Sequence, residues 1–144
     1  MAYDTLPEWS PGAVAMLGTG AGAPHAIPIS TAVRAGDRRI LMALAPRRES
    51  LARLRADPHA AFTLITRGNI ALTAHGTASV VAESLPGAEG VVAVALEVEE
   101  IQDHGQPTFV VVDGVRWHWT DAEAQRRDAA VRAALLALAD RLAG

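Results

Sequence analysis

The sequence predicts a single, mainly β domain in which six or seven antiparallel strands form a closed or nearly closed barrel, with a short helix after the third strand and a longer C-terminal helix. The apolar runs are short and separated by Gly, Pro, Asn and Asp clusters, which is typical of strands. Residues 91–101 alternate apolar side chains with glutamates, as in a strand with one buried face. With 144 residues, half of them hydrophobic, the chain can bury one core, so we expect one domain over residues 1–144.

The first strands are identified by the turn residues between them. A Gly- and Pro-rich cluster at 18–24 separates two apolar runs that we expect to form a hairpin. Pro28 lies inside the second run and indicates an edge or bulged position, because proline cannot donate to a strand ladder. A turn at 35–37 precedes the third run. The predicted strands cover residues 13–17, 25–33 and 39–44.

The middle of the chain changes from strand to helix and back. Leu51 and Leu54, three residues apart among charged residues, predict a short helix over 47–56. The Asp57-Pro58 pair ends this helix, since a residue before proline is pushed out of the α region. The remaining predicted strands cover residues 60–66, 70–82 with a break near Gly76, 91–101 and 108–112, and a tight turn then leads into a further strand-like segment at 115–119.

A second helix is predicted over about residues 121–142. Thr120 and Glu123 have the spacing of a capping box, in which the threonine oxygen accepts a backbone amide and the glutamate reaches back. An apolar stripe follows at helical spacing and predicts the buried face. Its members are Val131, Leu135, Leu138 and Leu142, with Arg132 expected elsewhere.

Composition excludes several classes of function. The chain has no cysteine, so it lacks disulfides, thiolate catalysis and Cys-based metal sites. A net charge of −3 argues against a nucleic-acid-binding face. No stretch reaches the ~20 apolar residues of a membrane span, and Asp4 and Glu8 differ from a basic signal-peptide start, so we expect a cytoplasmic protein. The five histidines show no metal-ligand spacing.

The strongest candidate for a binding site is the sequence APRRES at 45–50, where a strand ends and a helix begins. A phosphate there would meet the amides and dipole of a helix N-terminus, the guanidinium groups of Arg47 and Arg48, and the hydroxyl of Ser50. The alternative is that the arginines are solvated and Ser50 only caps the helix. The residues alone leave both interpretations open.

Three other side chains are candidates for pocket walls. His75, next to Gly76 in an apolar strand, could line a pocket or be satisfied locally. Trp117 and Trp119 are expected on one face of a strand, where they could wall a flat ring or be buried in a dimer interface. No nucleophile elbow, Gly-rich phosphate loop or paired carboxylates are found, so no side chain is assigned a catalytic role.

The order of several segments carries a resemblance that covers about residues 13–101. The segments are AVAMLGT at 13–19, PHAIPIS at 24–30, ILMAL at 40–44, SLARLRADPHAAF at 50–62 and IALTAHGTA at 70–78. Their order and spacing resemble the pyridoxamine 5'-phosphate oxidase-like family of FMN-binding split β-barrels. The resemblance implies a homodimer that holds FMN at its interface and acts as an oxidoreductase on a small-molecule substrate.

The resemblance also implies which residues contact the cofactor. It assigns to the edge of the flavin ring Pro28, Ile29, Ser30 and Thr31, and to the strand beneath it Ala43, Leu44 and Ala45. It assigns to the phosphate Arg47, Arg48, Ser50 and Leu51. Many members carry a basic residue where this chain has Ser50, so Arg47 or Arg48 would have to supply the positive charge.

Two alternatives to an FMN oxidoreductase stay open. Related barrels bind a deazaflavin in the same groove, which would make the chain a deazaflavin-dependent reductase. The other alternative is a non-catalytic barrel that has lost flavin and binds another small ligand. Fold alone does not separate these alternatives.

Overall fold

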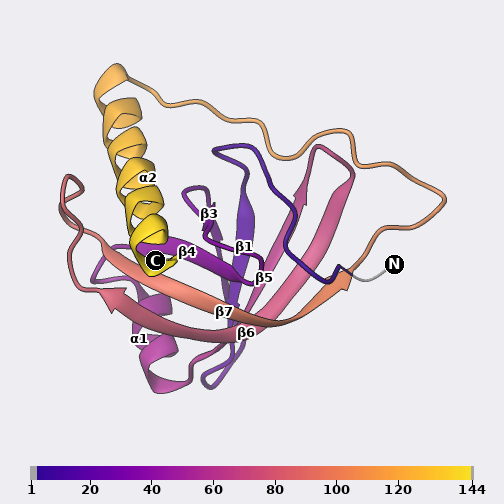
Figure 1. Cartoon of the computed structure of the whole chain (residues 1–144), viewed down its shortest axis with the longest axis horizontal. Coiled ribbons are helices and arrows are strands. Elements are labelled where there is room, and N and C mark those ends of the chain that lie inside the picture. The colour runs from indigo at the N-terminus through magenta and orange to yellow at the C-terminus, as the bar shows by residue number, and fades with distance from the viewer. Residues whose placement is uncertain (1–2, 144) are drawn as a thin grey trace.

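The computed structural model describes residues 3–143, and within them the chain forms seven strands and two helices. The strands curl into an antiparallel half-barrel, which confirms the predicted fold class (Figure 1). The strands are β1 (Ala15–Thr19), β2 (His25–Ile29), β3 (Val33–Arg34), β4 (Arg39–Leu44), β5 (His59–Thr66), β6 (Ile70–Ala82) and β7 (Val92–Asp103). The helices are α1 (Glu49–Ala56) and α2 (Ala122–Ala143).

The sheet order is β2-β1-β5-β6-β7-β4-β3, so β2 and β3, which are consecutive in the chain, lie at its two edges. The prediction of one strand over 25–33 is therefore wrong. The chain bends after Ile29, because β2 pairs with β1 while β3 pairs with β4. For the same reason α1 follows the fourth strand and not the third. The edge position predicted from Pro28 is confirmed.

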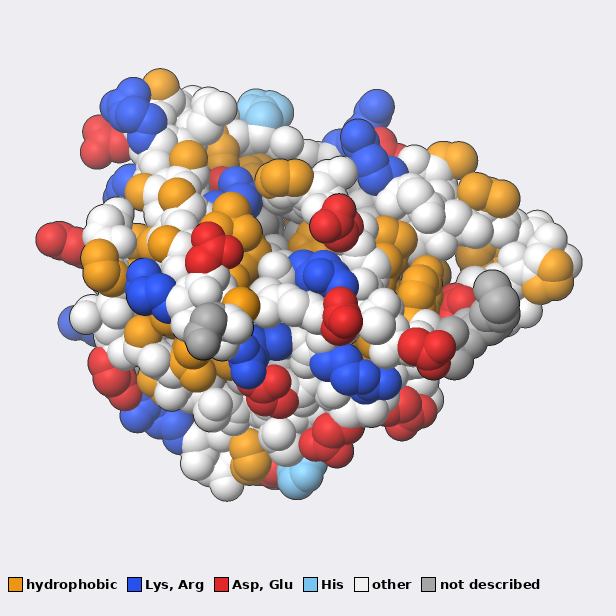
Figure 2. All heavy atoms as spheres, viewed as in Figure 1, with side chains coloured by type: hydrophobic (Ala, Val, Ile, Leu, Met, Phe, Trp, Pro, Cys, Tyr) orange, Lys and Arg blue, Asp and Glu red, His pale blue; other side chains and the backbone are white. Residues whose placement is uncertain are grey.

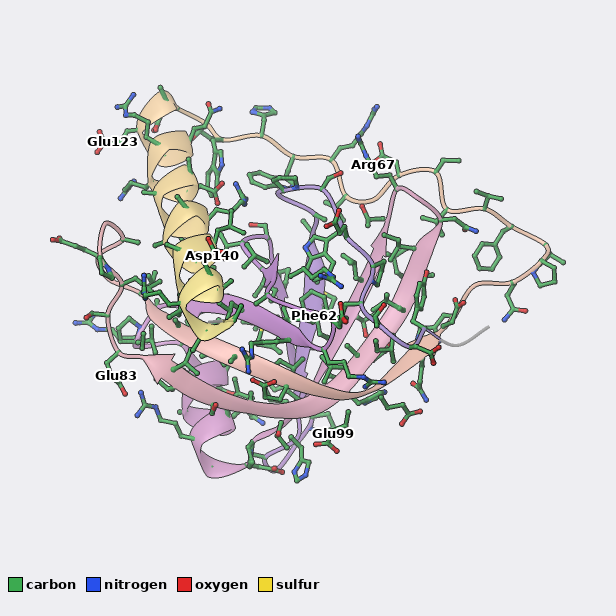
Figure 3. The ribbon with its side chains drawn as sticks, viewed as in Figure 1. Phe62, Arg67, Glu83, Glu99, Glu123 and Asp140 are labelled. Carbon is green, nitrogen blue, oxygen red and sulfur yellow. The ribbon has the colours of Figure 1, made fainter. Side chains whose placement is uncertain are left out.

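The main core fills the inside of the curved sheet. Phe62, Leu64 and Leu72 are fully buried there, and Figure 3 shows Phe62 within the curve of the sheet. The predicted alternation of β7 holds from Glu97 onward. The first five residues of β7 are instead all buried, because α2 and the loop after β6 cover their outer side.

Helix α2 packs against the outer face of β3 and β4 (Figure 1). Leu135 and Leu138 are buried as predicted, but Leu142 at the end of the helix is exposed. Arg132 was expected on the solvent side and lies largely buried, with Nη1 2.7 Å from the Asp128 carboxylate. Among the described residues, neither helix is long and apolar enough to cross a membrane.

Residues 104–121, here called the strap, connect β7 to α2 without regular secondary structure, so the predicted strands at 108–112 and 115–119 are wrong. The strap crosses the β5–β6 turn, where the amide of Asn69 donates to the carbonyl of Val111 (3.1 Å) and the amide of Val111 donates to Oδ1 of Asn69 (2.9 Å). Phe109 and Val112 are exposed. The strap's β-branched residues find no strand to pair with, so their propensity is not expressed.

The start of α2 differs from the predicted capping box. The helix begins at Ala122, and Oδ1 of Asp121 accepts the amide of Ala124 at 2.7 Å, so the N-cap is Asp121 and not Thr120. We expect Asp121→Ala to lower the free energy of unfolding by about 1 kcal/mol, because it leaves this amide without a partner. Thr120→Ala is the matched control and should leave the free energy of unfolding unchanged. Urea unfolding of both variants measures the difference, and equal losses would restore the capping box.

Candidate functional site

The predicted ring and phosphate segments meet where the two edges of the sheet approach each other. At one end, β3 pairs with β4, with Val33 opposite Leu41. At the other end, eight residues away on each segment, Nδ1 of His25 lies 3.4 Å from Oε2 of Glu49. Between these two contacts lie the stretches 26–32 and 42–48, which are not paired with each other as strands, because β2 pairs with β1 while β4 pairs with β7 and β3. We call this pair of stretches the seam.

All the residues assigned to the cofactor lie on the seam or in the first turn of α1. The exposed ones are Pro28, Ala45, Arg47 and Arg48; the half-buried ones are Ser30, Thr31 and Ala43; the buried ones are Ile29, Leu44, Ser50 and Leu51. The side chains of Leu44 and Leu51 belong to the main core. Leu44 and Leu51 therefore offer a ligand on the seam mainly their backbone, while the exposed residues offer side chains.

Arg47 and Arg48 form the charged end of the seam. Both are exposed, and neither guanidinium has a hydrogen bond or ion pair with any residue in 3–143. Arg48 is the N-cap residue of α1, and its side chain makes no capping bond. Two positive charges thus flank the first turn of a helix, where backbone amides lack intrahelical partners.

Ser50 does not cap α1, contrary to one of the two interpretations from the sequence. It is the second residue of the helix, and its Oγ is buried without a hydrogen-bond partner among the described residues. Nε2 of His25 is likewise buried and unpartnered. Because an unmet buried polar atom costs about 1–3 kcal/mol, the start of α1 retains unused hydrogen-bonding capacity.

Glu49 is the only carboxylate in the stretch 45–50, and its charge is compensated. Nε of Arg53 donates to Oε2 of Glu49 at 2.7 Å. This hydrogen bond, the positive charge of Arg53 and the nearby His25 together lower the pKa of Glu49 below its usual value. Arg53 also donates to the carbonyls of Ala21 and Ala23, which ties the β1–β2 turn to α1. A phosphate near Arg47 would consequently meet little repulsion from Glu49.

A groove of about 410 Å³ lies at the far end of β2, between β2 and the strap. Its walls include the indoles of Trp117 and Trp119, whose ring centroids lie 4.9 Å apart in a T-shaped arrangement. The residues that line it are Val14, Pro28, Ile29, Ser30, Trp117, His118, Trp119 and Thr120. The sequence predicted that the two indoles lie together, but nothing in it indicated that the strap carries them to Pro28 and Ser30.

The remaining histidine candidates lie elsewhere. Nε2 of His75 is 2.9 Å from Oε1 of Gln102, so His75 is satisfied locally. It also lines an open groove of about 470 Å³ with His25 and His59. Within residues 3–143, no group of three or more potential ligands is placed to hold a metal ion. On the face shown in Figure 2, arginines and acidic side chains are interspersed.

A scan against protein-family models finds no match for this chain, and neither does a search of curated proteins. Solved structures do match. A candidate pyridoxamine 5'-phosphate oxidase from Listeria innocua has 15% identity and a TM-score of 0.54, covering 65% of this chain and 89% of its own. An FAD-binding protein from Mesorhizobium loti has 12% identity and a TM-score of 0.51, covering 62% and 81%. An F420 reductase has 13% identity and a TM-score of 0.57, covering 67% and 98%.

At these identities the likeness concerns the fold. The half-barrel, its helix after β4 and its open seam define a split β-barrel. More specifically, the chain has the fold of the pyridoxamine 5'-phosphate oxidase-like split barrels.

Proposed function

We propose that this chain binds FMN at a homodimer interface and acts as an oxidoreductase on a small molecule. The observation that supports the proposal is the seam, whose two stretches contain Pro28 to Thr31 and Ala43 to Ala45 and which ends, next to α1, at two arginines without a hydrogen bond or ion pair in residues 3–143. From His25 to Ser30 the seam extends about 16 Å, at about 3.3 Å per residue. An elongated molecule with an anionic end and a flat apolar end suits this arrangement.

The residues present fit such a cofactor. The guanidinium groups of Arg47 and Arg48 and the helix N-terminus would hold the phosphate. Ser50 would contribute its backbone amide, because its hydroxyl is turned inward. The ring would lie against the backbone of 28–31 and 43–45, which the buried Ile29 and Leu44 keep in place. Bound FMN would supply hydride or electron transfer, while the chain orients it and excludes water.

A second copy of the chain is proposed to cover the outer face of β2, β1 and β5. Met16 lies opposite both Pro28 and Thr63, so the three side chains share this face. Met16 is 41% exposed and Ile65 on the same sheet is 54% exposed. Because Pro28 belongs to both surfaces, the uncovered apolar face is continuous with the ring segment of the seam. A subunit packed there would shield a bound ring from water.

The experiment adds FMN to the purified protein and removes the excess by gel filtration. We expect a dimer that retains absorbance at about 370 and 450 nm, as for any oxidised flavin. Met16→Arg places a charge in the proposed interface and should give a monomer that loses FMN. Leu142→Arg, at an exposed position on α2, is the control and should leave both properties unchanged. A monomeric wild-type protein that retains no flavin would overturn the proposal.

A deazaflavin is the second candidate cofactor, because an F420 reductase shares this fold over 98% of its own chain. The same seam would hold its phosphate and ring. Competition between FMN and a deazaflavin, followed by their different absorbance, decides between the two. If neither binds, the chain is a non-catalytic barrel that takes another small ligand.

A further inference from the structure

We infer that the groove between the strap and β2 binds a planar aromatic compound carrying a hydroxyl or amino group. This inference names the substrate class for the proposed flavin site, and it rests on the proposed function only in that respect. The groove shares Pro28, Ile29 and Ser30 with the segment proposed to touch the ring, so a compound bound there would lie beside the cofactor.

The two indoles determine the shape of the ligand. Trp117 and Trp119 meet at an interplanar angle of 89°, so together they form a right-angled aromatic corner. They are 37% and 38% exposed, so much of this surface has no partner within the described chain. Aromatic rings pair favourably by offset stacking on one ring and by edge-to-face contact with another. A flat ligand can make both contacts in this corner, whereas a saturated ring of the same size cannot.

His118 determines the polar group of the ligand. Its Nδ1 lies 3.1 Å from the carbonyl oxygen of Trp119. A carbonyl oxygen only accepts hydrogen bonds, so Nδ1 carries the hydrogen. With Nδ1 used in this way, Nε2 is the ring nitrogen left for another hydrogen bond. Ser30 and Thr120, which both carry hydroxyls, also line the groove, together with the apolar residues Val14, Pro28 and Ile29. A hydroxyl or amino group on the ring would therefore find partners.

The groove is held in shape by contacts that span the sequence. Nε1 of Trp117 donates to the carbonyl of Gly12 at 2.9 Å, which fixes the strap against the chain before β1. On the other side, Nη2 of Arg132 donates to the carbonyl of Ser30 at 3.2 Å, and the buried Asp128 holds Arg132. Preorganised walls reduce the entropy lost when a ligand binds.

The size of the groove favours a small molecule over a protein partner. Its 410 Å³ falls within the range of about 300–1,000 Å³ that is usual for small-molecule sites. The most exposed apolar side chains of the strap, Val110 and Val112, do not line it. A protein docking on the strap would cover those valines, so Val112 provides a control position that a small ligand in the groove does not reach.

The test uses FMN-free protein and two probes, 2-naphthol and decahydro-2-naphthol, which share the hydroxyl and differ in aromaticity. NMR follows the indole N–H signals of the three tryptophans. We expect 2-naphthol to shift the indole N–H signals of Trp117 and Trp119. The signal of Trp9, whose indole N–H donates to the carbonyl of Ala32, should stay unchanged. Its affinity should exceed that of the saturated probe by about three- to tenfold.

Trp119→Leu is the decisive variant, because Trp117 anchors the strap while the indole of Trp119 has no hydrogen bond to another described residue. We expect it to weaken 2-naphthol about three- to tenfold with the Trp9 signal in place, which shows that the core is folded. Val112→Ala should bind as the wild type does.

Equal affinity for the two probes, or wild-type affinity in Trp119→Leu, would overturn the inference. So would groove signals that move with protein concentration alone, since a second copy would then occupy the groove. Because the titration contains no FMN, it separates the two ideas. If the groove fails, 2-naphthol does not bind in it, whatever FMN does. If the flavin site fails, FMN is not retained while 2-naphthol still binds.

Discussion

Gly76→Ala is expected to abolish stable folding or to lower the free energy of unfolding by at least about 3 kcal/mol. Gly76 lies in β6 at the register shift opposite β7. A Cβ at this position would overlap the carbonyl of Glu97, whose carbon would be 2.8 Å away, and the Cα of Val98 would be 3.0 Å away. These are backbone atoms of the neighbouring central strand, so they cannot move aside as a side chain could.

The measurement is thermal unfolding followed by circular dichroism, with Gly20→Ala as the matched control. A Cβ at Gly20 would have no atom within 4 Å, and the substitution should change stability by no more than about 0.5 kcal/mol. For a chain of this length, we expect Gly76→Ala to lower Tm by roughly 10 °C or more. Similar Tm values for the two variants would show that β6 and β7 can separate locally at the bulge without loss of the fold.

The sequence predicts best those elements whose ends are marked by local chemistry. The bounds of β4 and β6 agree with the predicted residues 39–44 and 70–82, because turn residues flank both strands. Helix α1 ends at Ala56 because of the Asp57-Pro58 pair that follows. The predicted break near Gly76 appears as a β-bulge. Each of these depends on a few neighbouring residues.

Errors arise where the pairing partner is distant in the chain. The run 25–33 has strand character throughout. Its first half pairs with β1 and its last residue with β4, at opposite edges of the sheet, and no pattern in the neighbouring residues indicates this division. The strap has the composition of strands, but it pairs with no strand among the described residues. The burial of the ion pair between Asp128 and Arg132 was also missed, because a charged residue in a helix is usually expected on the solvent-exposed face.

The candidate site shows the same division. Helix-end chemistry in the sequence identified the turn with Arg47 and Arg48, and the resemblance supplied the two segments of the seam. The contact of His25 with Glu49 depends on the curvature of the whole sheet. So does the meeting of Trp117 with Pro28 across the groove. Those neighbours become visible only when the strands and the strap are placed in space.

The double substitution Arg47→Ala and Arg48→Ala is expected to weaken FMN binding by about 3 kcal/mol, or roughly a hundredfold or more. Each guanidinium would make a charge-assisted hydrogen bond to the phosphate. Neither has another partner in residues 3–143, so a loss of FMN affinity would come from the lost phosphate contacts. Fold stability should stay within about 0.5 kcal/mol, because both side chains are exposed. FMN fluorescence titration measures the affinity.

Ser50→Ala is the matched control for this site, and it separates the two parts of the proposed phosphate contact. Its buried Oγ has no partner, so removal of the hydroxyl should leave FMN affinity within about twofold if only the backbone amide of Ser50 is used. A larger loss would mean that the first turn of α1 rearranges to bring the hydroxyl to the ligand. Unchanged affinity in the double arginine variant would remove both guanidinium groups from the site and place the phosphate elsewhere on the seam.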